Sequence, residues 1–136
     1  MRQPDFENLL LVLNRKVPKR PTLFEFFMND KLYEMLAGKE ITAMEEDALT
    51  PFRILIHAFK NAGYDYVTIR GSDFDFSITQ KDMKKTISLN EGGGIFDRRS
   101  FEGYPWPDPD DYDYTRLDKL ASELPEDMKF IIWGPG

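Results

Sequence analysis

The sequence predicts an α/β fold in which short strands alternate with helices. Three runs rich in aromatic or β-branched residues have the length and composition of strands: 22–27, 64–69 and 129–133. Segments with apolar residues at helical spacing separate them. Strands joined through helices pair in parallel, so we expect three parallel strands with the second in the middle. The 136 residues are enough for one domain.

The first half of the chain begins with a predicted helix over residues 5–13, capped by Asp5. Its apolar face is formed by Phe6, Leu9, Leu10 and Leu13. The basic stretch 15–21 contains two prolines and ends this helix before the first predicted strand, 22–27.

Three more helices are predicted before the second strand. The first is capped by Asn29 or Asp30 and ends at Gly38. Thr42 followed by Glu45 fits a capping box that would open a short acidic helix. The strongest helical pattern is capped by Thr50, has Pro51 at its first helical position and ends at Gly63. Its apolar face is formed by Phe52, Leu55, Ile56 and Phe59.

The second half contains an interruption and then a last helix and strand. Alternating apolar residues over 74–89 predict a β-hairpin inserted after the second strand. Residues 92–94 and 104–109 have the composition of loops. Asp113 can cap a last helix, which Pro125 ends, with an apolar face formed by Leu117, Leu120, Ala121 and Leu124.

Composition restricts the classes of function. A net charge of −6 argues against a nucleic-acid-binding surface. The absence of cysteine excludes disulfides, thiolate catalysis and cysteine-ligated zinc, and a single histidine excludes a multi-histidine metal site. No run of 18 apolar residues exists, so we expect a cytoplasmic protein that does not bind membranes.

Candidate site residues follow the predicted strands, because ligands of parallel α/β folds bind at the carboxyl ends of the strands. These ends contain Asn29, then Arg70, Ser72 and Asp73, and finally Trp133. Asp73 could orient cationic nitrogens or take a proton, or it could cap a turn after Gly71. Arg70 could bind a substrate carboxylate, or it could pair with Asp73 or Asp75.

Other residues with reactive or ligating groups have plainer explanations. Glu25 interrupts an aromatic strand and is either a functional carboxylate or a sign of an exposed edge. His57 points away from the apolar face of its helix and is expected to be a surface residue. The glycines at 92–94 lack a P-loop lysine. The acids at 108–113 lack the pattern of a calcium loop.

Three segments resemble the uroporphyrinogen decarboxylase-like superfamily in order and spacing. Residues 13–21 resemble the helix end and basic, proline-containing stretch before that family's first strand. Residues 65–73 resemble its second strand, which ends in Ser-Asp, and residues 130–136 resemble its third strand, which ends in a Gly-Pro turn. The resemblance spans nearly all of this chain, but only the N-terminal part of the family's domain.

The resemblance implies a TIM (β/α)8 barrel, of which residues 1–136 would form the N-terminal portion of a single domain. Its first three βα units would be present, and the barrel would be incomplete. The family's two chemistries are decarboxylation of uroporphyrinogen and methyl transfer involving corrinoid proteins. In the decarboxylases, an aspartate at the position resembling Asp73 holds the pyrrole nitrogens. Their Arg-Gln-Ala-Gly-Arg-Tyr motif is replaced here by residues 26–31, which contain no arginine.

The resemblance therefore favours the methyltransferase branch, with tetrapyrrole decarboxylation as the alternative. Asp73 is the expected catalytic residue, and Arg70, Ser72, Glu25, Asn29 and Trp133 are the expected substrate-binding residues. We expect no cofactor or metal bound by this segment, with corrinoid and zinc in the complete enzyme. The expected partners are a small-molecule substrate or a corrinoid protein, and exposed strand edges favour a homo-oligomer. A noncatalytic α/β domain that binds a protein through the loop at 104–106 is a further alternative.

Overall fold

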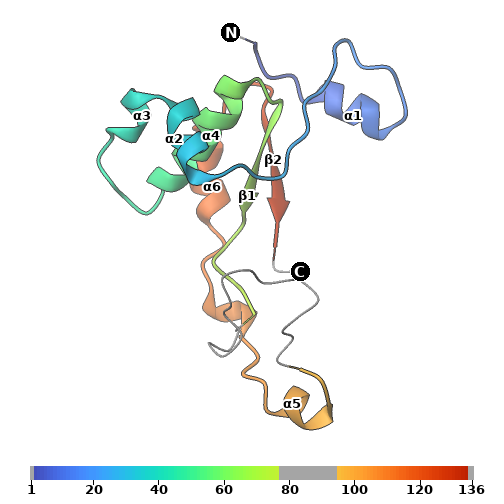
Figure 1. The fold of residues 1–136 in the computed structure, drawn as a ribbon, viewed down its shortest axis with the longest axis vertical. Helices are drawn as coiled ribbons and strands as arrows, with labels where there is room; N and C mark the ends of the chain where they lie inside the picture. Colours follow the sequence, from blue (N-terminus) through green and yellow to red (C-terminus); the bar gives the residue numbers. More distant parts are fainter. Residues whose placement is uncertain (1, 77–94, 135–136) are drawn as a thin grey trace. The chain divides into compact units, whose positions relative to one another are not determined.

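The computed structural model describes residues 2–76 and 95–134. The chain divides into two compact units, coloured along the sequence in Figure 1. The first unit comprises Met1–Ser72 and Tyr114–Trp133, and the second comprises Asp73–Asp113 and Gly134–Gly136. Most of the predicted hairpin over 74–89 and the glycines at 92–94 lie outside the described residues. Whether both units belong to one barrel domain stays a prediction.

A two-stranded parallel sheet lies at the centre of the first unit (Figure 1). Strand β1 is Tyr66–Arg70 and strand β2 is Lys129–Trp133. The strands pair in register, from Tyr66 beside Lys129 to Arg70 beside Trp133. The predicted parallel pairing of the second and third strands is therefore confirmed, although β1 begins two residues later than the sequence pattern suggests.

The predicted strand at 22–27 is wrong, because no β-strand forms there. The Tyr66 hydroxyl donates to the Glu25 carbonyl and accepts from the Glu25 N–H, each at 2.7 Å. The Thr68 hydroxyl donates to the Phe26 carbonyl. These side chains of β1 take up backbone groups that a strand would use in a ladder. The segment therefore lies against the face of β1 that carries Tyr66 and Thr68, and β1 is not a middle strand among the described residues.

Helix α4, Thr50–Ala62, is the main support of the sheet and ends at Gly63 as predicted. The predicted cap at Thr50 is wrong, because Leu49 is the N-cap and Thr50 is the first helical residue. Pro51 lies in its first turn, and Gly63 ends it in the left-handed conformation with φ 91°. Ile56 and Phe59 are fully buried, whereas Phe52 and Leu55 are half-buried. The predicted apolar face is confirmed by Ile56 and Phe59. His57 is half-buried rather than a fully exposed surface residue.

Helix α2, Asp30–Ala37, packs on α4 and also follows the prediction. The Asn29 side chain accepts a hydrogen bond from the Leu32 N–H at 2.9 Å, which caps the helix. The Tyr33 ring stacks on the Phe59 ring with centroids 6.0 Å apart. The core of the first unit therefore joins both helices to β1. Its buried apolar residues are Leu9, Tyr33, Ala37, Ile56, Ala58, Phe59, Tyr66, Val67, Ile69, Leu120 and Met128.

Three further capping predictions are wrong. Helix α1, Glu7–Leu13, begins after Phe6 without a side-chain cap, so Asp5 does not cap it. Helix α3, Lys39–Thr42, ends where the capping box was expected to open a helix. The Thr42 hydroxyl instead donates back to the carbonyls of residues 38 and 39. Helix α6, Arg116–Ala121, begins after Thr115 and not at Asp113.

A buried carboxylate ties the N-terminal segment to the start of β1. Asp65 is 1% exposed and forms ion pairs with Arg2, at 3.2 Å, and with Arg20. It also accepts the Asp5 N–H at 2.9 Å. The same arginines donate to backbone carbonyls of each other's segments, Arg2 to Pro21 and Arg20 to Gln3. The basic, proline-containing stretch is thus held by paired charge rather than by apolar burial.

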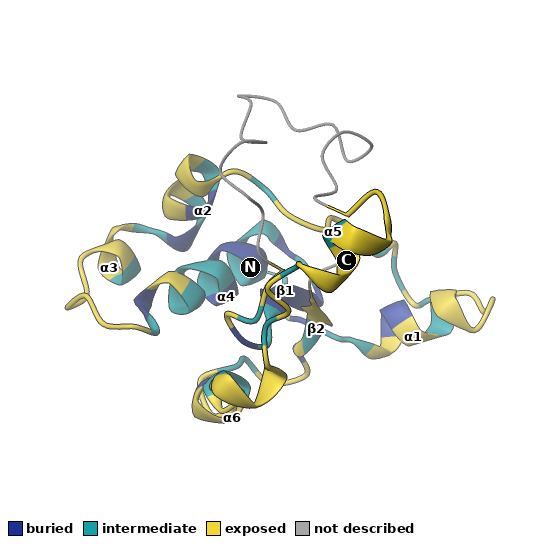
Figure 2. Cartoon of the chain, turned by 90° about the horizontal axis from the view of Figure 1, so that it is seen from below, coloured by how far each residue is buried: buried dark blue, intermediate teal, exposed yellow. Residues whose placement is uncertain are grey.

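The second unit contains helix α5, Arg98–Glu102, and the 3-10 helix η2, Pro109–Asp111. None of its described residues is buried, and α5 is mostly yellow in Figure 2. Aromatic rings contact one another in a chain of pairs formed by Phe74, Phe76, Phe101, Tyr104, Trp106 and Tyr112. Across residues 2–76 and 95–134, no helix has the length and apolar character needed to cross a membrane.

Candidate functional site

The carboxyl ends of β1 and β2 bring two predicted site residues together. Arg70 and Trp133 are register partners, and the Arg70 guanidinium carbon lies 5.3 Å from the centroid of the Trp133 ring. Parallel pairing places both residues at the same edge of the sheet, as the sequence predicted. A guanidinium on a ring face gains cation–π stabilisation, and the Nε atom of Arg70 is buried. This pair could hold a planar or anionic group at the end of the sheet.

Arg116 is a cation at this edge that the sequence analysis missed. One of its terminal nitrogens donates to the Arg70 carbonyl at 3.4 Å, and its guanidinium carbon lies 4.2 Å from the centroid of the Phe52 ring. Residue 116 opens α6, far in sequence from β1, so only the folded chain brings it beside Phe52 and Arg70. The one signal in the sequence was an arginine directly before an apolar helix face.

Ser72 and Asp73 directly follow β1 but belong to different units. Ser72 is 8% exposed and lies in the first unit, two residues beyond Arg70. Asp73 is exposed and belongs to the second unit. The catalytic role of Asp73 and its approach to Arg70 and Trp133 therefore stay predictions.

Glu25 and Asn29 occupy the segment that does not form a strand. Glu25 is exposed, and its carboxylate accepts the Phe26 N–H at 3.0 Å. Asn29 uses its side chain to cap α2, a structural role that accounts for its position. Desolvation, and after it the charge of Glu25, raise the pKa of the half-buried Tyr64. Both residues stay in the predicted substrate-binding set, but neither is at the end of a strand.

Metal chemistry has no support from the described side chains. Within residues 2–76 and 95–134, no group of three or more histidine, cysteine, aspartate or glutamate residues could hold a metal ion. The chain has one histidine and no cysteine. The histidine and cysteine ligands of the zinc that we expect in the complete enzyme are therefore not found among these residues. We assign no reaction step to zinc.

Two titratable groups near α4 have shifted pKa values for structural reasons. Hydrogen bonds from the Arg53 guanidinium, at 2.8 and 2.9 Å, are the main cause that lowers the pKa of Asp47 to about 2. Arg53 also binds Glu123 with two hydrogen bonds, at 2.7 and 3.0 Å. Desolvation lowers the pKa of His57, and the charge of Lys60 adds to this effect. The contacts of Arg53 hold α4 to the residues before it and to Glu123, and neither they nor His57 belong to the predicted site.

The chain matches no protein-family model, no curated protein and no solved structure. The resemblance to the uroporphyrinogen decarboxylase-like superfamily therefore depends on the three sequence segments alone and stays a prediction.

Proposed function

We propose that this chain supplies two parallel strands, those resembling the family's second and third, and part of the substrate edge of a uroporphyrinogen decarboxylase-like barrel enzyme. One observation supports the proposal above the others. β1 and β2 are parallel and in register, and their last residues, Arg70 and Trp133, meet at the carboxyl edge. This edge is where enzymes with parallel α/β barrels place their active sites.

The chemistry of this edge suits a large planar substrate that carries carboxylates. Trp133, 36% exposed, offers part of its ring for stacking, and the guanidinium of Arg70 can bind a carboxylate through two hydrogen bonds. Arg116 adds a second positive charge at the end of β1. Tetrapyrroles and corrinoids both combine a flat macrocycle with polar or acidic side groups. The proposal favours methyl transfer to or from a corrinoid, with the tetrapyrrole decarboxylase as the alternative.

Calorimetric titration with two macrocycles tests this proposal. The chain is titrated with hydroxocobalamin, a corrinoid, and with uroporphyrin, a tetrapyrrole that carries eight carboxylates. We expect saturable binding of hydroxocobalamin, weakened roughly tenfold by Arg70→Ala, because a hydrogen bond to a charged group contributes about 1.5–3 kcal/mol. Binding of uroporphyrin alone would favour the decarboxylase, and binding of neither would contradict the proposal.

The matched control removes an arginine from the second unit. Arg98 is 85% exposed in its side chain and pairs with Glu102 within α5, at 2.6 Å. Arg98→Ala changes the net charge as Arg70→Ala does, so equal losses in both variants would indicate general charge attraction instead of a site.

A second candidate function is protein binding by the second unit. The observation that favours it is the exposure of Phe101, on α5, and of Trp106, in the loop that follows, at 48% and 50%. Exposed aromatic residues of this kind are enriched in protein interfaces. This function is favoured over the enzyme if two results are found together. The unchanged chain pulls down a defined partner that Trp106→Ala does not, and the unchanged chain binds neither macrocycle.

We also propose a cytoplasmic location. Its support is the absence of cysteine, which suits a compartment where disulfides do not form. Fluorescence microscopy of a tagged chain in its native cells would test this location.

A further inference from the structure

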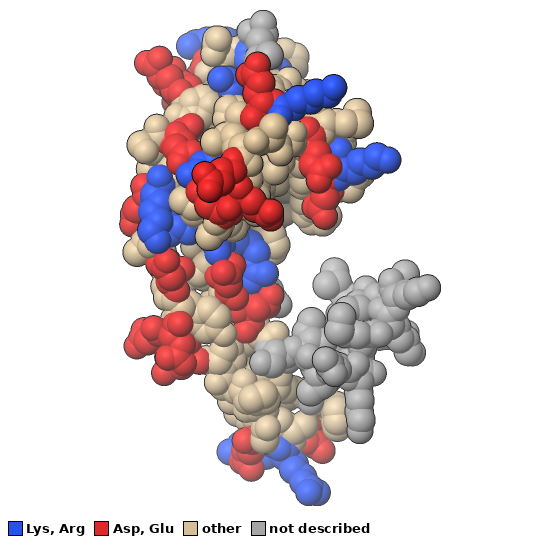
Figure 3. Space-filling model, turned by 90° about the vertical axis from the view of Figure 1, so that its left-hand side faces the viewer, with Lys and Arg blue, Asp and Glu red and all other residues tan. Residues whose placement is uncertain are grey.

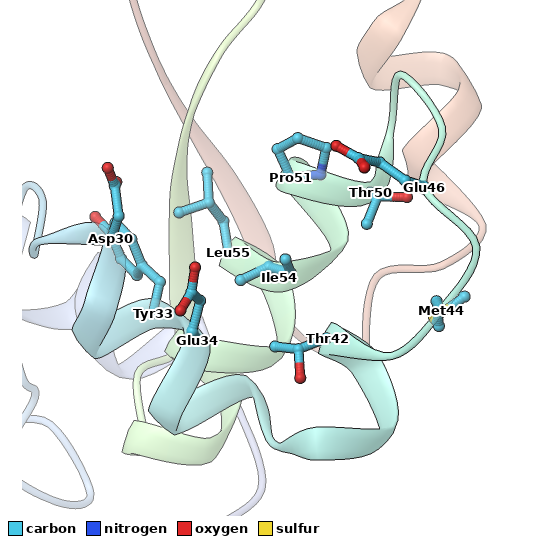
Figure 4. Close-up of a pocket in the computed structure, with 10 residues that line it drawn as sticks. All are labelled: Asp30, Tyr33, Glu34, Thr42, Met44, Glu46, Thr50, Pro51, Ile54 and Leu55. Atoms are coloured by element: carbon cyan, nitrogen blue, oxygen red, sulfur yellow. The ribbon is translucent and has the colours of Figure 1, made fainter.

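A cavity in the first unit lies away from the strand ends and has a distinct chemistry. Its volume is about 500 Å³, and it opens between α2, the segment that follows α3, and the first turns of α4 (Figure 4). Its lining residues are Asp30, Tyr33, Glu34, Thr42, Met44, Glu46, Thr50, Pro51, Ile54 and Leu55. Three of these are acids, and none is a lysine, arginine or histidine.

The floor of the cavity is apolar and firmly packed. Tyr33 and Thr50 are buried, at 8% and 7% exposed, and Ile54 and Leu55 are half-buried on α4. The hydroxyls of the two buried residues are already used. Tyr33 accepts the Met28 N–H at 2.6 Å, and Thr50 donates to the Glu45 carbonyl at 3.1 Å. The floor therefore offers hydrocarbon and ring surface for contact.

The carboxylates stand on opposite sides of this floor. Asp30 and Glu34 are one helical turn apart on α2, and Glu46 comes from the segment across the cavity, with Leu55 and Ile54 between the two sides (Figure 4). None of the three carboxylates forms an ion pair or a side-chain hydrogen bond with residues 2–76 or 95–134. By contrast, the nearby Asp47 carboxylate is fully engaged with Arg53.

The surrounding surface strengthens the attraction for cations. Residues 30–50 carry six acids and two lysines, a net charge of −4. The face shown in Figure 3 displays acidic side chains in several groups among the basic ones. Among the described residues, no group of three or more carboxylates or other ligating side chains lies close enough together to hold one metal ion. A matching ligand therefore carries separate positive charges joined by hydrocarbon.

We propose that this cavity binds an aliphatic polyamine. One ammonium group would pair with Asp30 and Glu34, a second would pair with Glu46, and the methylene chain between them would cover Ile54 and Leu55. A linear amine satisfies charge at both ends and apolar contact in the middle, whereas a hydrated metal ion satisfies charge alone. This binding does not depend on the substrate edge at Arg70 and Trp133.

Isothermal titration calorimetry with spermidine tests the proposal, with Mg²⁺ at equal ionic strength as the charge-only comparison. We expect saturable 1:1 binding of spermidine that is tighter than binding of Mg²⁺. Glu46→Gln and Glu34→Gln should each weaken spermidine binding about 2- to 5-fold, the range expected for one solvent-accessible ion pair. Met44→Ser, which removes apolar lining from the mouth, should weaken spermidine binding and leave Mg²⁺ binding unchanged.

The matched control is Glu40→Gln. Glu40 is an exposed acid on α3 in the same acidic region, but it does not line the cavity. Its substitution makes the same change of charge and should leave spermidine binding unchanged. Equal losses in Glu40→Gln and Glu46→Gln, equal affinities for spermidine and Mg²⁺, or no saturable binding would each overturn the proposal. Circular dichroism of the variants verifies that the helices are retained.

Discussion

The two units use aromatic residues in opposite ways. In the first unit, Phe59 and Tyr66 are completely buried, with ring centroids 6.0 Å apart. In the second unit, Phe101 and Trp106 also pair, at 5.0 Å, yet about half of each side chain is exposed. Ring contact is therefore common to both, but exclusion of water is found only in the first.

The difference lies in what surrounds the rings. Phe59 lies on α4, a helix of 13 residues that packs on β1 and α2. These elements together shield its ring from water. Phe101 lies on α5, a helix of five residues, and Trp106 follows it in a proline-containing loop. A short helix and a loop cannot present a continuous apolar face. Aromatic content alone thus predicts contact between rings, and regular structure decides whether they form a core.

The largest expected effect comes from removing a ring from each unit. Phe59→Ala should lower the free energy of unfolding by about 3–5 kcal/mol, because it leaves a cavity among the rings of Tyr33, Tyr64 and Tyr66. Phe101→Ala should change it by no more than about 0.5 kcal/mol, since the side chain is half exposed. Guanidinium chloride denaturation followed by far-UV circular dichroism measures both. Similar losses in the two variants would contradict the contrast between the units.

A second effect concerns Asp65, the buried carboxylate before β1 in the first unit. Asp65→Asn should lower the free energy of unfolding by about 2–3 kcal/mol, because it removes the charge from the hydrogen bonds with Arg2 and Arg20 while keeping the side-chain shape. Hydrogen exchange should also quicken in residues 2–21. Asp5→Asn is the control, because its contact with Lys19 at 3.9 Å is exposed and contributes about 0.5 kcal/mol or less. Unchanged exchange in Asp65→Asn would show that this pairing does not hold the segment.

A smaller effect is expected from the glycine that ends α4. Gly63 has φ 91°, where a side chain is strained, so Gly63→Ala should cost about 1–2 kcal/mol of stability. Gly103, which follows α5, has φ −90°, and substitution there requires no change of backbone region. Thermal unfolding of Gly63→Ala and Gly103→Ala compares the two helix ends. A larger loss in Gly103→Ala would mean that the second unit contributes more to stability than its exposure indicates.

The smallest effect is a pH dependence from His57. Burial lowers its pKa in the folded chain, so the unfolded chain binds the proton more readily. The resulting contribution to stability is present above the unfolded pKa of about 6.5 and is lost as the pH falls below that value. Urea denaturation at pH 7.5 and 5.5 should show a smaller decrease in His57→Gln than in the unchanged chain. Asp47, with a pKa of about 2, does not titrate in this window.

The sequence by itself determined the elements whose signals are local. The spacing of Ile56 and Phe59, with proline at the start and glycine at the end, specified α4. The Asn29 cap specified the start of α2, and the β-branched composition of residues 66–69 and 129–133 specified two strands. Parallel pairing of those strands followed from the helix between them.

Only the tertiary structure decided the features that depend on distant partners. The run at 22–27 has the composition of a strand, but hydroxyls from Tyr66 and Thr68 take its backbone groups, and no local pattern encodes that competition. The burial of Asp65 requires two arginines from separate segments, and Arg116, far along the chain, reaches the end of β1 only in the folded structure. The acidic cavity likewise combines α2 with α4 and the segment before it. Periodicity reports which face of an element is apolar, whereas the identity of its neighbour is set when the whole chain packs.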